Sequence, residues 1–333
     1  MRVLVLHNAV KDTPTADEQD VLTQRDAILG ALQVLGLTAR SLGCTLNLEA
    51  VRRSALEYQP DVVFNLVESL AGTDRLMPLV PLLLDALQIP YSGASSAALL
   101  ATTNKVMAKE RLRQFGLPTP EWLTIDGSFS SSGWISNSTW IIKPIWEHAS
   151  LGMDDQAVLV PQDEEDLRGE IVRRQQRMGC PMLAERFIEG REFNLSLLAG
   201  NVLPPAEIDF SSYPVGKPRI VGHAAKWDET SFEYRQTPRR FGYPASDNDL
   251  LDTLQDLARQ CWSLFELSGF ARVDFRVDGQ GHPWILEVNV NPCLSPDAGF
   301  AAALSEGGMG YEEAVRLILN ETLKPTPAAT DFA

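Results

Sequence analysis

The sequence predicts a mixed α/β protein, with a parallel sheet in its N-terminal part and antiparallel strands further along. Short apolar runs alternate with helical spacing over residues 2–66, which is typical of βαβ units with parallel strands. Residues 271–292 contain two stretches in which polar and apolar residues alternate, joined by a Gly-containing turn. That pattern is typical of a β-hairpin.

Composition excludes several classes of function. The 333 residues suffice for two or three domains with sizeable cores. A net charge of -15 without any basic block argues against binding to nucleic acid or an anionic membrane surface. No apolar run approaches the roughly 20 residues of a membrane span, and the start does not resemble a signal peptide. Four scattered cysteines predict reduced thiols in a cytoplasmic protein.

The first domain is expected to span residues 1–92 and to contain βαβ units. Its expected elements are strands at 2–6, 38–42 and 61–66, helices at 20–35 and 79–88, and a short strand and turn at 89–93. Gly36 is the stop signal of the first helix. No G-x-G-x-x-G sequence follows the first strand, so a dinucleotide-binding fold is not supported.

The rest of the chain mixes helices with paired strands. The expected helices lie at 95–100, 104–115, 163–178, 246–267 and 311–322. The expected strands lie at 140–143, 156–160, 182–187 and 192–199, with weaker ones at 207–213 and 223–227. The strands at 182–187 and 192–199 are expected to pair around the turn Glu189-Gly190. Residues 127–133 should form a loop, and the tail 324–333 should be disordered.

The hairpin predicts a metal site. A register that pairs Val277 with Trp284 sets Asp274 opposite Glu287, and Asn289 follows on the same face as Glu287. Directly opposed carboxylates repel each other, and a divalent cation would remove the repulsion because hard oxygen ligands suit Mg²⁺. A surface hairpin whose charges are screened by water fits the same pattern.

Other charged residues admit two interpretations each. Lys143 ends a strand before a loop, where an ammonium group can meet a phosphate, or it is a plain surface lysine. Glu185 and Glu192 flank a tight turn as site carboxylates or as solvated charges. Lys226 lies on a weak strand, where an edge lysine is common. Arg272 could form a structural ion pair within the hairpin.

The order and spacing of these residues resemble the ATP-grasp ligases, and most closely their D-alanine–D-alanine ligase branch. The resemblance covers about residues 61–322. It is strongest at 89–93, 103–105, 116–120, 142–144, 185–193 and 271–292. It implies a three-part ATP-grasp fold in which ATP lies between two α+β subdomains. The expected boundaries are 1–92 for the N-terminal βαβ domain, 93–183 for the central subdomain and 184–323 for the C-terminal subdomain.

The resemblance also implies roles for single residues. The implied ATP ligands are Lys105 and Lys143 for phosphates, Lys226 for the γ-phosphate, Glu185, Arg186 and Ile188 for the adenine pocket, and Glu192 for the ribose hydroxyls. The implied ligands of Mg²⁺, or of Mn²⁺ in its place, are Asp274, Glu287 and Asn289. The implied catalytic residues are Arg272, Ser150 and Lys226, of which Arg272 would stabilise negative charge that develops during transfer.

The implied activity is ATP- and Mg²⁺-dependent ligation of a carboxylate to an amine through an acyl phosphate, releasing ADP and phosphate. Ala149, Trp227 and Ala298 stand where the dipeptide ligases carry polar residues, and Asp20 loosely matches a glutamate that meets the substrate amine. We therefore expect other amino acids or small carboxylic acids as substrates, and not D-alanine in both sites. A true D-alanine–D-alanine ligase and a non-catalytic nucleotide sensor are the alternatives. A homodimer through the first domain is common in that family.

Overall fold

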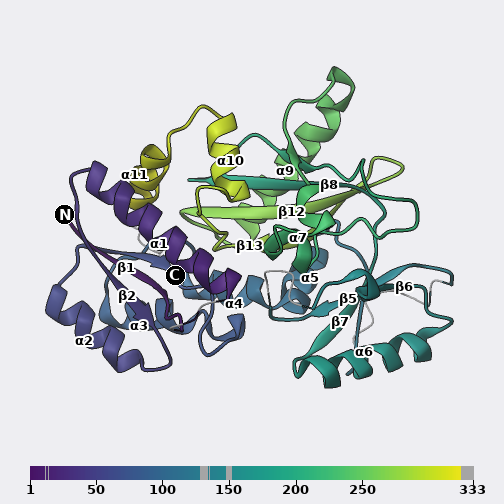
Figure 1. Ribbon diagram of the computed structural model, residues 1–333, viewed down its shortest axis with the longest axis horizontal. Coiled ribbons are helices and arrows are strands. Elements are labelled where there is room, and N and C mark those ends of the chain that lie inside the picture. Colours follow the sequence, from purple (N-terminus) through teal and green to yellow (C-terminus); the bar gives the residue numbers. More distant parts are fainter. Residues whose placement is uncertain (12, 14, 128–133, 135, 148–151, 324–333) are drawn as a thin grey trace, which may run out of the picture.

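The structure is a computed structural model that describes residues 1–11, 13, 15–127, 134, 136–147 and 152–323. It is built around three sheets: a parallel sheet of three strands, an antiparallel sheet of four and a larger antiparallel sheet of six (Figure 1). The predicted mixed α/β fold is confirmed. Most of the predicted Ser-rich loop, Ala149, Ser150 and the tail from residue 324 lie outside the described residues.

The N-terminal part forms the parallel sheet in the strand order β2-β1-β3. Its elements are β1 (Arg2–Asn8), α1 (Ala16–Val34), β2 (Thr38–Cys44), α2 (Leu48–Tyr58), β3 (Val62–Leu66), a 3₁₀ turn (Asp74–Leu76) and α3 (Leu79–Leu87). The middle of β1 and all of β3 are buried, which is why both read as apolar runs. The three predicted strands and the helix at α3 are confirmed.

Two helices of this part differ from the prediction. Helix α1 begins before Asp20, because the Glu18 carboxylate accepts a hydrogen bond from the Thr15 amide at 3.1 Å and closes an additional first turn. Helix α2 was not predicted. Only Val51 and Ala55 of it are buried, but Leu48, Val51, Ala55 and Tyr58 recur at helical spacing and pack in one core, so the sequence does carry the pattern of a helix here.

The four-stranded sheet has the order β4-β7-β5-β6 and is covered by α6. Its elements are β4 (Trp122–Thr124), β5 (Trp140–Pro144), a 3₁₀ turn (Asp155–Ala157), β6 (Val158–Leu159), α6 (Glu164–Met178) and β7 (Met182–Arg186). The strand predicted at 156–160 is therefore shorter, because a 3₁₀ turn takes its first residues. The prediction of α6 is confirmed, and its ends are set by the Asp163 side chain as N-cap and by Gly179 in the left-handed region as C-cap.

The six-stranded sheet has the order β11-β10-β8-β12-β13, with β9 paired to β8. Its strands are β8 (Gly190–Leu198), β9 (Asn201–Val202), β10 (Ala206–Ile208), β11 (Arg239–Arg240), β12 (Phe270–Asp278) and β13 (Pro283–Asn289). The helices that follow or cover it are α4 (Ser96–Thr103), α5 (Lys105–Gln114), α7 (His223–Trp227), α8 (Phe232–Arg235), a 3₁₀ turn (Ala245–Asp247), α9 (Asn248–Leu264), α10 (Gly299–Glu306) and α11 (Tyr311–Thr322). Helix α10 was not predicted.

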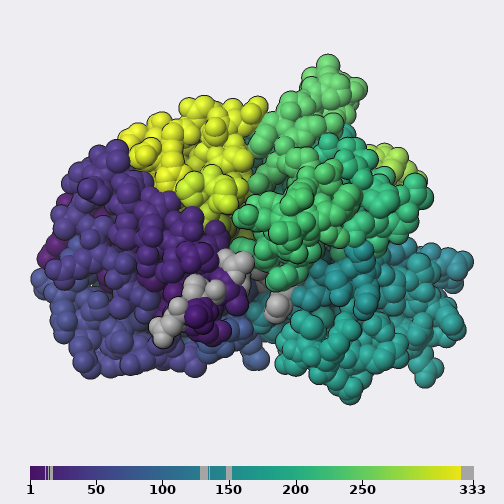
Figure 2. Space-filling model, in the orientation of Figure 1, coloured from purple at the N-terminus to yellow at the C-terminus, as the bar shows by residue number. Residues whose placement is uncertain are grey.

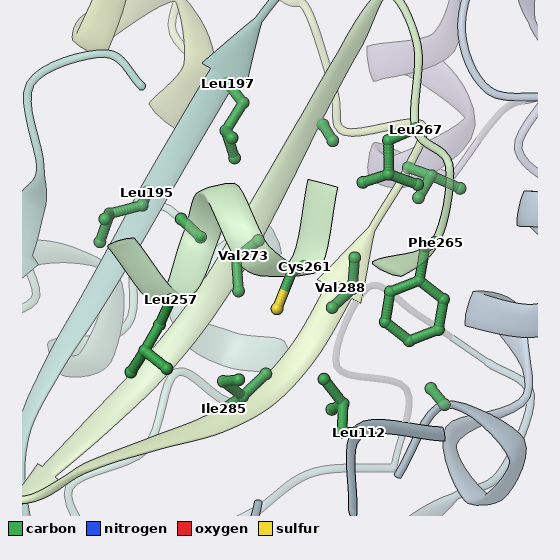
Figure 3. Packing of buried hydrophobic residues seen from close by; sticks show 14 of the residues in the cluster. Leu112, Leu195, Leu197, Leu257, Cys261, Phe265, Leu267, Val273, Ile285 and Val288 are labelled. Atoms are coloured by element: carbon green, nitrogen blue, oxygen red, sulfur yellow. The ribbon is translucent and has the colours of Figure 1, made fainter. Parts of the chain in front are cut away.

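One face of this sheet is the largest hydrophobic core. Helices α4, α5 and α9 pack on it, with Leu112 of α5 and Leu257 of α9 close to Val273 and Ile285 of the hairpin strands (Figure 3). Because this face is apolar, the alternate residues of β8, β12 and β13 must point to the opposite face. That opposite face carries the charged residues predicted for the site.

A second core joins the two ends of the chain. It contains Ile28 of α1, Phe300 of α10 and Ile318 of α11, together with residues of the parallel sheet. In Figure 2 the purple N-terminal lobe and the yellow C-terminal helices accordingly lie against each other, whereas the teal residues of the four-stranded sheet form a lobe at the lower right. Among the described helices, none combines the length and the apolar character that a membrane span requires.

The predicted hairpin of β12 and β13 is confirmed, with one change of register. Asp274 lies opposite Glu287, as expected. Nearer the turn, Val277 pairs with Pro283 and not with Trp284, because the register shifts by one residue between Asp274 and Phe275. A bulge of this kind adds one residue to one strand, so the carboxylate pair is kept although the turn end is displaced.

Two other predictions about strands are wrong. Strands β7 and β8 do not pair with each other: β7 lies between β4 and β5, and β8 lies between β10 and β12. The Glu189-Gly190 turn therefore links two sheets and does not close a hairpin. Residues 223–227 form helix α7, so Lys226 lies on a helix and not on a strand.

Gly190, where the chain enters β8, is a position that only glycine fits. Its φ is +147°, and a Cβ there would lie 2.0 Å from the Val277 carbonyl oxygen. We expect Gly190→Ala to lower the free energy of unfolding by about 2 kcal/mol or more, because β8 would have to move away from β12. Urea unfolding measures the change. The control is Gly279→Ala, in the hairpin turn, where a Cβ meets nothing within 4 Å; equal losses in both variants would contradict the explanation.

Candidate active site

The polar face of the six-stranded sheet brings the predicted metal and ribose residues together. Cross-strand pairs of β8 and β12 set Glu192 opposite Arg276, Asn194 opposite Asp274 and Ser196 opposite Arg272. Strand β13 adds Glu287 beside Asp274 and Asn289 beside Arg272. Since side chains alternate along a strand, these residues share one face, opposite the hydrophobic core.

Helix α5 connects this face to the four-stranded sheet. Asn104 caps the helix by accepting hydrogen bonds from the Val106 and Met107 amides. The Lys105 ammonium in the first turn donates to the Glu147 carbonyl at 2.6 Å and lies 3.9 Å from a carboxylate oxygen of Glu287. Burial lowers the pKa of Lys105. Its place near the positive end of the helix dipole is unfavourable, which is consistent with a role in binding anions.

Three buried charges lie side by side between α5 and the four-stranded sheet. Lys143, at the end of β5, donates to one carboxylate oxygen of Glu185 on β7 at 2.7 Å. Lys109 forms an ion pair with the other oxygen and donates to the Thr119 hydroxyl at 2.8 Å and the Pro120 carbonyl at 3.1 Å. The side chains of Lys109, Glu185 and Lys143 are only 1%, 2% and 9% exposed. Sequence reasoning missed Lys109, although it follows Lys105 by one helical turn.

The charges of this group depend on each other. Burial alone would raise the pKa of the Glu185 carboxyl, but the Lys109 and Lys143 ammonium groups hold that pKa below its usual value. Burial lowers the pKa of Lys109 to about 8, against the attraction of Glu185. The group thus combines two ammonium groups with one carboxylate.

The predicted metal ligands are neighbours on strands β12 and β13. Asp274 accepts two hydrogen bonds from Arg272, at 2.7 and 2.8 Å, and one from the Asn194 amide at 2.9 Å. A carboxylate has about four acceptor sites, so Asp274 keeps one for a cation. The described residues contain no cluster of three or more His, Cys, Asp or Glu that could hold a metal alone. Two carboxylates and the amide of Asn289 fit Mg²⁺, which commonly binds to one or two carboxylates and completes its shell with phosphates.

Helix α7 carries Lys226 over the same face. Burial lowers the pKa of Lys226, and the Arg272 guanidinium lowers it further, whereas Glu287, Asp274 and Glu192 act to raise it. The helix is held from its N-terminal side, where the His223 amide donates to the Met153 carbonyl at 3.0 Å. The segment that carries Lys226 is thus tied to Met153, close in sequence to Ser150, which lies outside the described residues.

The residues predicted for the nucleoside lie at the link between the two sheets. Glu192 pairs with buried Arg276 at 2.7 Å, and burial raises the pKa of its carboxyl. Arg186 pairs with Glu121 at 2.6 Å and lies over the Trp284 ring. The Ile188 side chain is buried. Alternation along the strand predicts that Arg276 shares a face with Arg272 and Asp274, but the sequence indicated no role for this buried residue.

The parallel sheet meets the segment after β13 through a polar network. Asp20 accepts hydrogen bonds from the Ser295 hydroxyl at 2.6 Å and the Cys293 thiol at 3.1 Å. Gln24 accepts from the Leu294 amide at 2.5 Å and donates to Glu68 at 3.1 Å. The network brings the predicted Asp20 to the segment that follows β13. Ala298, which precedes α10, offers no side-chain cap to that helix.

The fold and the site together define an ATP-grasp protein: a parallel-sheet lobe followed by two antiparallel sheets with lysines and paired carboxylates between them. The family described as D-ala D-ala ligase C-terminus matches residues 112–320, more than half of the chain. The chain therefore belongs to the D-alanine–D-alanine ligase family and is an ATP-dependent carboxylate–amine ligase.

Individual relatives agree. A D-alanine–D-alanine ligase of Aquifex aeolicus is 28% identical over 324 residues, which are 96% of this chain and 100% of the relative. One of Moorella thermoacetica is 28% identical over 322 residues, covering 94% and 97%. The solved D-alanine–D-alanine ligase of Bacillus anthracis in complex with ATP is 19% identical, covers 97% of both chains and has a TM-score of 0.72, which shows the shared fold.

Proposed function

We propose that the protein uses ATP and a divalent cation, Mg²⁺ or Mn²⁺, to join a small carboxylic or amino acid to an amine, releasing ADP and phosphate. The observation that carries the proposal is an excess of buried cations. Lys109 and Lys143 share the carboxylate of Glu185, and Lys105 is buried beside them, 3.9 Å from the Glu287 carboxylate, so three ammonium groups face two carboxylates. Buried charges need counter-charges, and a triphosphate would supply them.

The proposed ATP site spans both antiparallel sheets. Lys105 and Lys143 hold phosphates, and Lys226 on α7 meets the γ-phosphate. The base lies along residues 185–188 and is read through backbone groups, because Lys109 and Lys143 already engage the Glu185 carboxylate. Glu192 receives the ribose hydroxyls with the oxygen that Arg276 leaves available.

Asp274, Glu287 and Asn289 are the proposed ligands of the cation. When bound, the cation neutralises charge on the phosphates and on the transferring phosphoryl group. Arg272 holds Asp274 in place through its two hydrogen bonds. The same guanidinium faces the reacting atoms and stabilises the oxyanion that forms when the amine attacks.

The chemistry follows from these positions. A carboxylate is a poor electrophile, and it is activated by accepting the γ-phosphoryl group of ATP. The amine then attacks the acyl phosphate and displaces phosphate. Lys226, Lys143 and Arg272 orient the groups and offset their charge, which is the main task of protein side chains in phosphoryl transfer. Ser150, which lies outside the described residues, is proposed to act with them.

The acceptor side of the site favours substrates other than D-alanine in both positions. Trp227 follows Lys226 on α7 and offers apolar area with one N–H donor. Ala298 stands at the start of α10 without a polar side chain. Each hydrogen bond that is lost from a buried recognition site costs about 1 kcal/mol or more, so a larger or less polar amino acid should be preferred.

The test is competition between substrates at saturating ATP and Mg²⁺, followed by phosphate release. We expect kcat/KM for D-alanine to be lower, by about tenfold or more, than for amino acids with larger apolar side chains. Product analysis by mass spectrometry identifies the amide. The relatives in Aquifex aeolicus and Moorella thermoacetica carry the name D-alanine–D-alanine ligase; a clear preference for D-alanine at both positions would make that the activity here and would reject the proposed specificity.

A further inference from the structure

The charge balance around Glu185 differs from that of a simple ion pair. Glu185 contacts Lys143 with one oxygen and Lys109 with the other. Within the part of the chain that the structure describes, Glu185 is the carboxylate in ion-pair contact with either lysine. Two ammonium groups and one carboxylate leave a net charge of +1 on three buried side chains.

Lys109 is held by several contacts at once. It is 1% exposed, and it donates to the Thr119 hydroxyl and the Pro120 carbonyl in addition to its ion pair. The Thr119 hydroxyl in turn donates to the Ile285 carbonyl of β13 at 2.9 Å. A chain of contacts therefore runs from strand β13 through Thr119, Lys109 and Glu185 to Lys143.

Lys109 and its partner Glu185 belong to different parts of the fold. The apolar residues of its helix, such as Ala108 and Leu112, pack in the core of the six-stranded sheet. Glu185 and Lys143 belong to the four-stranded sheet. The Lys109–Glu185 pair thus joins the two sheets, and the Lys109 ammonium is already engaged by Glu185, the Thr119 hydroxyl and the Pro120 carbonyl.

We propose that Lys109 is a positioning residue that neutralises Glu185 and thereby leaves the charge of Lys143 available to the phosphates of ATP. Without Lys109, the Glu185 carboxylate and the Lys143 ammonium form a neutral pair, and the group loses the net charge that attracts a polyanion. The inference rests on the proposed function, because it assigns Lys143 to the phosphates.

The experiment measures the Kd of Mg–ATP by titration calorimetry, together with the thermal midpoint of each variant. Lys109→Met, with a net charge of 0, should weaken binding about 10- to 100-fold, as is typical of residues that orient the ligands of a metal ion. Lys109→Met combined with Glu185→Gln returns the net charge to +1 and should recover most of the affinity. Leu112→Ala, on the same helix and buried in the core, destabilises α5 without changing the charge and should leave Kd within about threefold.

Rescue by the second substitution is what a purely structural role cannot produce. If the role is purely structural, the double variant should bind Mg–ATP as poorly as Lys109→Met or worse, and that result would overturn the inference. An equal loss of affinity in Leu112→Ala would overturn it as well. If Lys109→Met does not fold, Lys109→Gln removes the charge and keeps a donor for Thr119, and the same comparison applies. Failure of the unsubstituted protein to bind Mg–ATP would instead reject the proposed function, and this inference with it.

Discussion

Glu287→Gln is expected to reduce turnover by about a thousandfold or more, equivalent to about 4 kcal/mol of transition-state stabilisation. Glu287 lies opposite Asp274 in the hairpin, and both carboxylates are partly buried on the polar face. Replacing one carboxylate by an amide removes the charge that would hold the cation. The measurement is the rate of phosphate release at saturating ATP and substrate over a range of Mg²⁺ concentrations.

The fold should not suffer from the same change. Without a cation, Asp274 and Glu287 are like charges on neighbouring strands, which is unfavourable, so Glu287→Gln should match or exceed the unsubstituted protein in thermal midpoint when no metal is present. Added Mg²⁺ should raise the midpoint of the unsubstituted protein more than that of the variant. Turnover at the normal rate by Glu287→Gln would show that the hairpin does not bind the catalytic metal.

The hairpin was predictable because its pattern is local. Alternation along β12 and β13 assigns each side chain to a face, and one assumed pairing sets Asp274 opposite Glu287. The assumed pairing near the turn was wrong, since Val277 pairs with Pro283. The bulge between Asp274 and Phe275 compensates for that displacement. The predicted pairing of Asp274 with Glu287 is therefore confirmed, although the predicted pairing at the turn is wrong.

The positions of Lys226 and Lys109 were not predictable in the same way. Helix α7 is a single turn, too short for apolar periodicity to distinguish it from a strand. It is held by a contact of His223 with Met153, far away in the sequence. Lys109 gains its role from Glu185, which lies on another sheet. Sequence spacing within one element carries no information about such partners.

The same reason explains the wrong pairing of β7 with β8. Two apolar stretches separated by Glu189 and Gly190 have the local features of a hairpin. Their true partners are distant: Glu185 pairs with Trp122 and Ile141, and Glu192 pairs with Arg276. Tertiary pairing decided the outcome, and it placed Glu185 within reach of two lysines.

Glu185→Gln should lower the free energy of unfolding by about 3–5 kcal/mol, the usual loss when one partner of a buried ion pair is removed. It leaves the ammonium groups of Lys109 and Lys143 buried without their carboxylate. Urea unfolding at pH 7 measures the loss. Glu49→Gln, which removes an exposed pair with Arg52, is the control and should change little.

The dependence on pH separates this electrostatic loss from a packing defect. In the unsubstituted protein the pKa of Glu185 is lowered, so the stability it contributes is present above the pKa of the unfolded chain and is lost as the pH falls through the folded pKa. The pKa of Lys109 is lowered from 10.5 to about 8, so the unfolded chain binds more protons between these values and stability rises with pH across that window.

Glu185→Gln removes the attraction that keeps Lys109 charged, which widens the window toward lower pH. Raising the pH from 7 to 9 should therefore recover more stability in Glu185→Gln than in the unsubstituted protein. When Lys109→Met is also present, Glu185→Gln should cause a smaller loss of stability at pH 7. A loss that is the same at both pH values and in both backgrounds would mean that shape, and not charge, makes Glu185 necessary.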